Sequence, residues 1–414
     1  MKLLNVDTLS EARGKLKIYT DHIAPKVESV GLLEATGRIL ASDIHSSENI
    51  PPYRRSTVDG YAVRSADLGA ASDMLPTFLQ ITGEVFLGKC AASLSSSPGS
   101  CVYTPTGGEI VEGFDSVVMT EYCETFGDNM VAVSKPTAPG ENVVQPGEDI
   151  RDGETLLRKG QILRAQDIGT LAASGISSVP VFVPWSITII STGDELVSPD
   201  QVPGPGQIRD INTYAIAARS IQEGLLVRRT IAVKDDHDAI LKALEEAKCD
   251  SDAVVLSGGS SKGKKDMSSD LIEAVSDCKV LTHGLAAKPG KPTITGFDRS
   301  SRTMFIGLPG HPAAALMIYE QLLIRIWHEL TEQPKTRTVR AAITTNLQSA
   351  PGRRTFQLVR LREGTEMETG MIAEPIFAKS GMISPMSRAD GYFEMAENQE
   401  GVRAGEQVDV HLWK

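Results

Sequence analysis

The feature that most constrains the fold is an alternation of apolar and amphipathic runs between about residues 183 and 332. Strand-like runs rich in Val, Ile and Thr are WSITIIST, LLVRRTIAVKDD, DAVVLSGGS, KVLTHGLAAK and TMFIGLPG. Helical periodicity marks NTYAIAARSIQEG, HDAILKALEEA, SSDLIEAVSD and PAAALMIYEQLLIRIWHEL. Strands that alternate with helices form a parallel sheet with helices on both faces. The sequence therefore predicts an α/β domain over these residues.

The flanking regions have a different texture. Residues 7–22 have the apolar spacing of a helix. Short β-prone runs separated by Ser, Gly and Pro occupy about 75–145 and again 338–414. We expect a small antiparallel lobe in the first stretch and a β-barrel or sandwich in the second.

Composition excludes several classes of protein. Lys and Arg number 42 against 53 Asp and Glu, so the net charge of −11 gives no general attraction to nucleic acid or anionic lipid. No apolar stretch is long enough to span a bilayer, and the start lacks a signal-peptide core. We expect a cytoplasmic protein with no membrane or nucleic-acid partner. The five cysteines have no CxxC spacing and are expected to be small buried thiols.

The loops after the predicted strands carry the residues suited to chemistry. In an open α/β sheet, ligands bind beyond the carboxyl ends of the strands. Four such ends read STGDE (191–195), KDD (234–236), SGGSSKG (257–263) and GLPGHP (307–312). Gly258 and Gly259 would let backbone N–H groups approach a phosphate. Pro312 fits a first helical turn, which would place Gly310 at the positive end of a helix.

A stiff basic turn, KPGKP (288–292), precedes the last of these strands. Proline fixes φ and glycine permits positive φ, so Lys288 and Lys291 would be held on a turn of nearly fixed shape. Alone, this pentapeptide is equally well a solvated surface turn. Beside the glycine-rich loops it predicts an anion site, and the nearby carboxylates favour a hard cation such as Mg²⁺ between acid and phosphate.

Several simpler interpretations compete with this one. Residues 258–264 match GxxxxGK, but Lys265 stands where a P-loop needs Ser or Thr, which disfavours a nucleotide-hydrolysing enzyme. Taken singly, Asp59 is better explained as a hairpin turn, Asp149 as a turn acid and Asp266 as a helix cap. Thr106 taken alone gives almost no indication of a functional site.

Eight motifs in order give a family resemblance. They are EATGRILASDI, PPYRRSTVDGYAV, YTPTGGEIVEGFDSVVMTE, QPGEDIRDGETLLRKG, STGDEL, SGGSSKGKKD, KPGKP and GLPGHP. Together they resemble the molybdopterin molybdenumtransferase (MoeA) family, which includes the E domain of gephyrin. The resemblance implies an α/β plus β multidomain fold in a homodimer. Its four parts would be a discontinuous N-terminal domain (1–50 and 145–182), an inserted β-rich lobe (51–144), a MogA-like α/β domain (183–332) and a C-terminal β-barrel (333–414).

The resemblance also implies a reaction. Family members insert molybdate into the dithiolene of adenylylated molybdopterin with Mg²⁺ and release AMP, at a site between two subunits. Implied partners are a second copy of the chain, a MogA-like adenylyltransferase and molybdoenzyme acceptors. Two alternatives stay open: a scaffold paralogue of the same fold without transferase activity, and a tungstate-inserting variant.

Site residues carry over by matching motif. The catalytic set is Asp59, Asp149, Glu195, Asp235 and Asp266, of which Glu195, Asp235 and Asp266 would hold the metal. The substrate-binding set is Thr106, Gly258, Gly259, Ser260, Lys288, Lys291, Pro309, Gly310, Pro312 and Ser380. The sequence departs from common family patterns at Arg54 and Arg55, at His237 and at Gly284, which leaves the anion contacts and the choice between molybdate and tungstate open.

Overall fold

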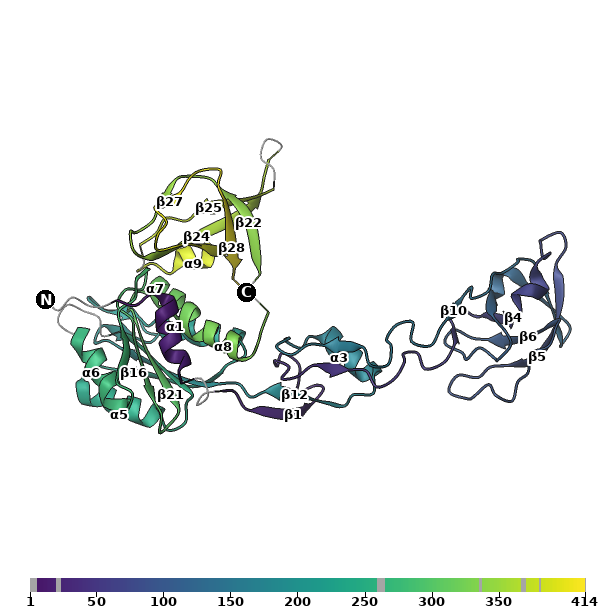
Figure 1. Cartoon of the computed structure of the whole chain (residues 1–414), viewed down its shortest axis with the longest axis horizontal. Coiled ribbons are helices and arrows are strands. Elements are labelled where there is room, and N and C mark those ends of the chain that lie inside the picture. The colour runs from purple at the N-terminus through teal and green to yellow at the C-terminus, as the bar shows by residue number, and fades with distance from the viewer. Residues whose placement is uncertain are drawn as a thin grey trace. The chain divides into compact units, whose positions relative to one another are not determined.

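The computed structural model describes residues 6–19, 24–258, 265–334, 337–365, 370–379 and 381–413 (Figure 1). The chain divides into two compact units. The first comprises Met1–Ser42, Lys159–Leu163 and Val179–Lys414, and the second Asp43–Arg158 and Arg164–Ser178. The four domain boundaries given above stay a prediction.

A six-stranded sheet with the order β16-β13-β17-β21-β20-β18 is the centre of the first unit. Its strands are β13 (Ser186–Thr192), β16 (Leu226–Val233), β17 (Ala253–Gly258), β18 (Val280–His283), β20 (Ile294–Asp298) and β21 (Thr303–Leu308). The parallel arrangement predicted from the sequence holds for β16, β13, β17 and β21. Strand β20 is the exception, because it runs antiparallel to both of its neighbours and had not been predicted.

Helices cover both faces of this sheet, as the alternation predicts. They are α1 (Leu9–Lys17), α4 (Asn212–Gln222), α5 (His237–Ala247), α6 (Lys265–Val275), α7 (Pro312–Tyr319) and α8 (Arg325–Leu330), with a π-helical turn, Glu320–Ile324, joining the last two. Side chains of successive strand residues point to opposite faces. Ile189 accordingly packs in the cluster that contains residues of α1, α4 and α7, whereas Ile190 packs with α5 and α6.

The C-terminal part of the first unit is a five-stranded barrel, as expected. Its strands are β22 (Thr338–Ile343), β24 (Arg354–Glu363), β25 (Met371–Pro375), β26 (Gly391–Met395) and β28 (Gln407–Leu412), closed by pairing of β24 with β26. A short strand of the α/β part, β19 (Ala287–Lys288), adds to the edge of β24. Short elements beside the barrel are α9 (Ser384–Arg388), β23 (Leu347–Gln348) and β27 (Gly401–Val402). The barrel and the α/β part are thus joined by backbone hydrogen bonding.

The first unit also contains two short strand pairs, β1 (Val27–Gly31) with β12 (Ser178–Phe182), and β14 (Leu196–Val197) with β15 (Ile208–Arg209).

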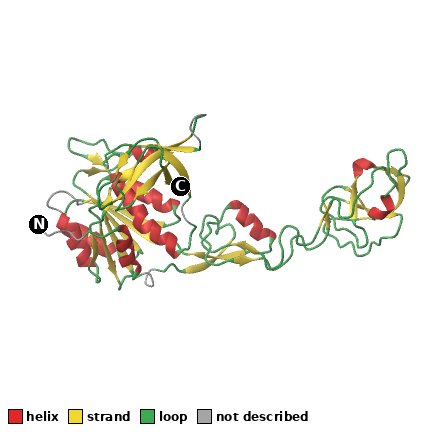
Figure 2. Cartoon of the chain, turned by 45° about the horizontal axis from the view of Figure 1, so that its top comes forward, coloured by secondary structure: helices red, strands yellow, loops and turns green. Residues whose placement is uncertain are grey.

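The second unit is rich in strands and loops, as its sequence predicts (Figure 2). Its six-stranded sheet has the order β7-β4-β6-β5-β9-β8. These strands are β4 (Gly60–Val63), β5 (Thr77–Glu84), β6 (Ser100–Thr104), β7 (Ser116–Met119), β8 (Cys123–Phe126) and β9 (Met130–Val133). Smaller elements are β2 (Ile44–His45), β3 (Arg55–Ser56), β10 (Val143–Val144), β11 (Thr155–Leu157), α3 (Ala165–Ala173) and two 3-10 turns, Ser65–Leu68 and Thr120–Tyr122.

Two expectations from composition can be compared with the structure. None of the helices in the described part of the chain has the length and apolarity that crossing a membrane requires. All five cysteines are free, but Cys90 and Cys249 are exposed, so the expectation that every thiol is buried is wrong for these two. Cys101 is buried as expected. Its burial raises the pKa of the thiol to about 12.

Candidate functional site

A cavity of about 1030 Å³ lies where the α/β part meets the barrel in the first unit. Its walls come from residues within four segments, 287–292, 309–317, 346–358 and 376–386. The first two segments contain the KPGKP and GLPGHP loops at the carboxyl edge of the sheet. The last two contain the start of β24 and the loop before α9. The structure therefore brings Lys288, Lys291, Pro309 and Gly310 into one cavity, as the sequence predicts.

The charge of the cavity is opposite to that of the whole chain. Lys288, Lys291, Arg353 and Lys379 line it, while none of the described residues in its wall is acidic. All four cationic residues are exposed enough to meet a ligand from solution. Like charges gathered in a concave site strengthen one another's field and attract an oppositely charged ligand. In a chain with a net charge of −11, this arrangement favours an anion.

The KPGKP turn is held in place by its backbone. Lys288 lies opposite Thr355 in the β19–β24 pairing, and Thr293 donates its hydroxyl to the carbonyl of Gly290 at 2.7 Å. Gly290 has a φ of 120°, and a Cβ there would overlap the side chain of Ile318 on α7. Only glycine suits both the conformation and the close approach. The two lysines are thus carried by a rigid turn packed between the barrel and a helix.

The GLPGHP loop ends at the N-terminus of α7, with Pro312 as the first helical residue, as predicted. His311 occupies the capping position but makes no side-chain capping bond. Asn212, at the start of α4, donates to the Gly310 carbonyl at 2.9 Å and to the Ser257 hydroxyl at 2.7 Å. It therefore joins the loop after β21 to the end of β17. Backbone N–H groups at a helix start attract anions, so this loop adds to the positive character of the cavity.

The predicted acids lie at the same edge of the sheet but do not line the cavity. Glu195 follows β13, Asp235 follows β16, and Gly258 ends β17 opposite Thr192. The backbone N–H of Asp235 donates to Asp194 Oδ1 at 3.2 Å, so the two acidic loops touch. Strands β16 and β13 stand at one end of the sheet order, whereas the cavity lies by β21 and β20.

Three predicted site residues, Gly259, Ser260 and Ser380, lie outside the described residues. Asp266 is in the first turn of α6, and its side chain is likewise outside the described part of the structure.

Asp59, Thr106 and Asp149 belong to the second unit. The Thr106 backbone N–H and hydroxyl both donate to Asp59 Oδ1, at 2.7 and 3.0 Å. These bonds, the backbone one foremost, lower the pKa of the exposed Asp59 carboxyl. Two residues predicted separately therefore form one polar group. Asp149 is exposed on another loop of this unit, where its N–H donates to the Ile50 carbonyl at 3.1 Å.

Three family models match consecutive parts of the chain. They are the MoeA N-terminal region (domain I and II) over residues 8–175, a probable molybdopterin binding domain over 188–329, and the MoeA C-terminal region (domain IV) over 340–413. Molybdopterin molybdenumtransferase of Haemophilus influenzae is 30% identical over 97% of this chain and 98% of its own length. The chain belongs to the MoeA family.

Other relatives agree with this assignment. Molybdopterin molybdenumtransferase 2 of Mycobacterium tuberculosis is 30% identical, and the match covers 92% of this chain and 94% of the relative. Two crystal structures of a molybdopterin biosynthesis MoeA protein from Pyrococcus horikoshii are 32% and 30% identical, with TM-scores of 0.81 and 0.79. Each match covers 99% of this chain and all of the neighbour. The MoeA fold predicted from the sequence is confirmed, and several curated relatives bear the name of a transferase.

Sequence reasoning missed half of the basic wall of this MoeA chain. Arg353 and Lys379 line the cavity, and so does Phe377, whose side chain is largely exposed. Arg353 directly precedes β24 in PGRRTF, and Lys379 stands beside Ser380 in AKSGMIS. A basic residue at the start of a strand is a weak signal by itself. Its importance follows from the pairing of β24 with β19, which the sequence does not reveal.

Proposed function

We propose that this MoeA-family chain acts in molybdenum cofactor biosynthesis by inserting molybdenum from molybdate into adenylylated molybdopterin, with release of AMP. The observation that carries the proposal is the cavity lined by Lys288, Lys291, Arg353 and Lys379 without a described acid. Molybdate is a dianion, and a pterin nucleotide carries phosphates. Bringing two anionic substrates together requires cations and N–H donors fixed in advance.

The cationic residues have different uses. Arg353 offers a planar fork of N–H donors that suits two oxygens of one oxyanion, whereas Lys288 and Lys291 act as compact charges with rotatable donors. Hydrogen bonds in which both partners are charged are stronger than neutral ones. Because the backbone of Lys288 pairs with β24, the backbone needs little reorganisation when the anion arrives.

The size and lining of the cavity suit a ligand larger than an oxyanion. Its volume of about 1030 Å³ is at the upper end of the range found for small-molecule sites. Phe377, Met382 and Ile376 add apolar surface to the wall. An aromatic ring can stack on a planar heterocycle. We infer that the pterin ring lies along this surface while its phosphate and the molybdate face the cations.

The acidic loops suit a divalent cation. Among the described residues no cluster of three potential metal ligands is found, but Mg²⁺ commonly uses one or two carboxylates together with substrate phosphates and water. Glu195 and Asp235 could provide these on touching loops, and Asp266 is proposed as a third ligand. When bound, Mg²⁺ would offset the charge of the phosphates as AMP leaves. Gly258, with Gly259 and Ser260 after it, would hold those phosphates by backbone N–H groups.

We further propose a homodimer in which Asp59, Thr106 and Asp149 serve the cavity of the partner subunit. Support comes from the Asp59–Thr106 pair, which keeps an exposed carboxylate ionised at a fixed place. A carboxylate there could take a proton from a dithiolene thiol as its sulfur bonds to molybdenum, and pass that proton to the molybdate oxygen that leaves as water. A MogA-like adenylyltransferase as supplier, molybdoenzymes as acceptors and a cytoplasmic location belong to the same proposal.

An assay with the purified chain tests this function. Adenylylated molybdopterin, Mg²⁺ and molybdate are mixed with the chain, and AMP is measured over time, with a parallel series in tungstate. We expect AMP release that requires both an oxyanion and Mg²⁺, and its rate in the two series ranks molybdate against tungstate. Absence of AMP release with either oxyanion, from a chain that still binds molybdopterin, would favour the scaffold alternative.

A further inference from the structure

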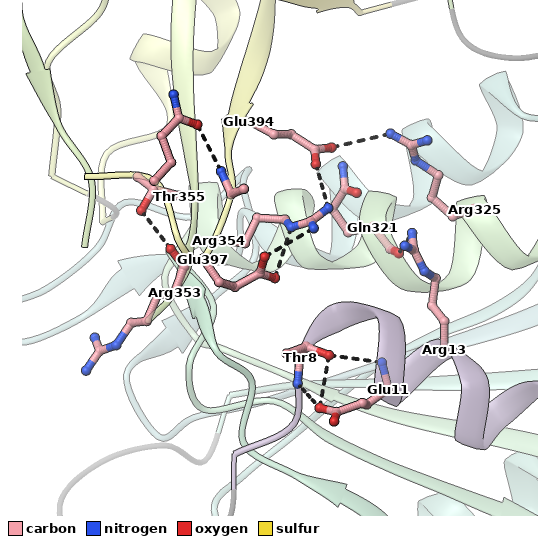
Figure 3. A network of polar contacts seen from close by, with 12 residues as sticks. Thr8, Glu11, Arg13, Gln321, Arg325, Arg353, Arg354, Thr355, Glu394 and Glu397 are labelled. Atoms are coloured by element: carbon pink, nitrogen blue, oxygen red, sulfur yellow. Dashed lines mark hydrogen bonds and ion pairs between the residues drawn. The ribbon is translucent and has the colours of Figure 1, made fainter. Parts of the chain in front are cut away.

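Two neighbouring arginines at the start of β24 have different surroundings. Arg353 lines the cavity and pairs with no carboxylate among the described residues. Arg354 does not line the cavity. Its side chain forms ion pairs with two acids of the barrel (Figure 3). Its Nε and Nη2 donate to the two oxygens of Glu397 at 3.1 and 3.3 Å, and its Nη1 donates to Glu394 Oε2 at 3.0 Å.

Glu394 extends this contact beyond the barrel. Its second oxygen, Oε1, lies 3.5 Å from Nη2 of Arg325, the first residue of α8. Helix α8 continues, through the π-helical turn, the same helical segment that begins at Pro312 with the GLPGHP loop. The chain of charges Arg354–Glu394–Arg325 thus connects the barrel to the helix that carries one wall of the cavity (Figure 3).

The backbone of Arg354 holds the other wall. Its N–H donates to the Ala286 carbonyl at 2.9 Å, and the residue lies opposite Ala287 in the β19–β24 pairing. One step along, Thr355 lies opposite Lys288. Arg354 therefore stands next to Arg353 in sequence and next to Lys288 across the ladder. Any shift of this residue would move both cations.

The electrostatics separate the roles of the two arginines. Burial opposes the charge on Arg354, but the hydrogen bond with Glu397 and the charge of Glu394 outweigh it, so its pKa is raised. A guanidinium whose donors face carboxylates has little left for a ligand, whereas Arg353 keeps its donors available. The half-buried side chains of Arg354 and Glu394, 29% and 18% exposed, are screened less than a surface pair.

We propose that Arg354 is a positioning residue for oxyanion binding: by joining Glu394 and Glu397 of the barrel, and through Glu394 reaching Arg325, it sets the separation of Arg353 and Lys288. The inference rests on the proposed function, because the ligand it serves is molybdate. It assigns a role in ligand binding to a side chain outside the cavity. Small displacements of charged groups weaken binding because the site is no longer matched to its ligand.

Calorimetric titration of molybdate into the full chain, at fixed ionic strength, tests this inference. Arg354→Met keeps the length of the side chain and removes its charge, and we expect the dissociation constant to rise about tenfold. Arg354→Lys retains a charge that can pair with one acid, so it should restore affinity to within about threefold of the unmodified chain. Glu394→Gln should weaken binding in the same direction as Arg354→Met, because it cuts the link to Arg325.

The matched control is Arg362→Met. Arg362 lies on the same strand, and its Nε donates to Glu374 Oε1 at 2.7 Å, but it does not line the cavity. Both methionine variants should lower the melting temperature, yet only Arg354→Met should change molybdate affinity. Equal affinity of Arg354→Met and the unmodified chain would overturn the inference, leaving the proposed function in place. Should Arg354→Met fail to fold, unchanged affinity in Glu394→Gln would overturn it instead. No molybdate binding by the unmodified chain would contradict both.

Discussion

At the scale of single residues, the cavity depends on cations that form no ion pair with an acid in the described part of the chain. Lys288 is the clearest case, because the pairing of β19 with β24 fixes its backbone while its side chain stays exposed at the cavity. Asp59 is the acidic counterpart in the second unit, held by two hydrogen bonds from Thr106. Substitutions at these two positions separate binding from chemistry.

Replacing Lys288 by alanine should weaken binding of molybdate and of the pterin nucleotide. Hydrogen bonds to charged groups contribute about 1.5–3 kcal/mol, so we expect the dissociation constant to rise at least about tenfold. Calorimetry measures this directly. The control is Lys242→Ala on α5, which removes an exposed lysine of the same unit that is outside the cavity wall. An unchanged dissociation constant for Lys288→Ala would make KPGKP a plain structural turn.

Replacing Asp59 by asparagine should slow insertion strongly and leave the fold intact. The asparagine Oδ1 can still accept both bonds from Thr106, so the loop should keep its shape while the negative charge is lost. A general acid or base contributes about 10²–10⁴-fold to a rate, and we expect a loss in that range. The AMP-release assay gives the rate, and thermal unfolding checks the fold. Insertion at the full rate would remove Asp59 from the catalytic set.

At the scale of elements, two turns of the first unit can be tested. The KPGKP turn requires Gly290, whose φ is 120° and whose missing Cβ makes room for Ile318. We expect Gly290→Ala to lower the free energy of unfolding by about 1–3 kcal/mol and to reduce molybdate affinity. Gly405→Ala is the control: its φ is 85°, but a Cβ there meets nothing within 4 Å. Chemical denaturation and calorimetry should show a larger effect for Gly290→Ala on both quantities, and equal effects would argue against the packing explanation.

The turn between β20 and β21 gives a prediction for pH. Asp298 accepts from the hydroxyls of Ser300 and Ser301 at 2.6 and 2.7 Å, and from the Ser301 N–H at 3.0 Å. Burial opposes its ionisation, but these bonds outweigh burial and lower its pKa from 3.8 to about 2. A lowered pKa means that the stabilisation is complete above the unfolded-state pKa, near 4, and is lost as the pH falls toward 2.

We therefore expect Asp298 to contribute about 2 kcal/mol to the free energy of unfolding at neutral pH. Asp298→Asn should remove the part of the acid dependence that lies between about pH 4 and pH 2. Urea unfolding of both forms across this range measures the difference. Parallel pH profiles for the two chains would contradict the assignment.

Some helices and strands could be predicted from the sequence, and others could not. Helix α5 and strand β17 were predictable because hydrophobic periodicity and β-branched runs are local signals. Strand β20 was missed because it is short and contains Gly296, where a Cβ would overlap Ile272 of α6. Strand propensity disfavours that glycine, and only tertiary packing explains it.

Two of the four basic residues in the cavity wall were predictable from the sequence. Glycine-rich loops and lysines at strand ends follow from the topology of α/β sheets, so Lys288, Lys291 and Gly310 could be named. Arg353 and Lys379 enter through β24 and the loop before α9, which meet the sheet only because β24 pairs with β19. Strand order likewise decided that Glu195 and Asp235 stand away from the cavity wall.

At the scale of the whole molecule, four basic side chains of an acidic chain line one cavity, and two parts of the first unit build that cavity. The α/β part provides Lys288 and Lys291, and the barrel provides Arg353 and Lys379. Neither part could form this wall alone. We propose that an oxyanion binds here, between the α/β part and the barrel. The acidic loops after β13 and β16 would instead bind Mg²⁺.

The most direct test is a crystal of the full chain soaked in tungstate, because tungsten is located unambiguously by its anomalous scattering. We expect a strong peak in the cavity, within hydrogen-bonding distance of Lys288, Lys291 and Arg353, which disappears in crystals of Arg353→Met. A tungstate site found only beside Glu195 and Asp235, or a cavity that stays empty of tungsten, would contradict the account.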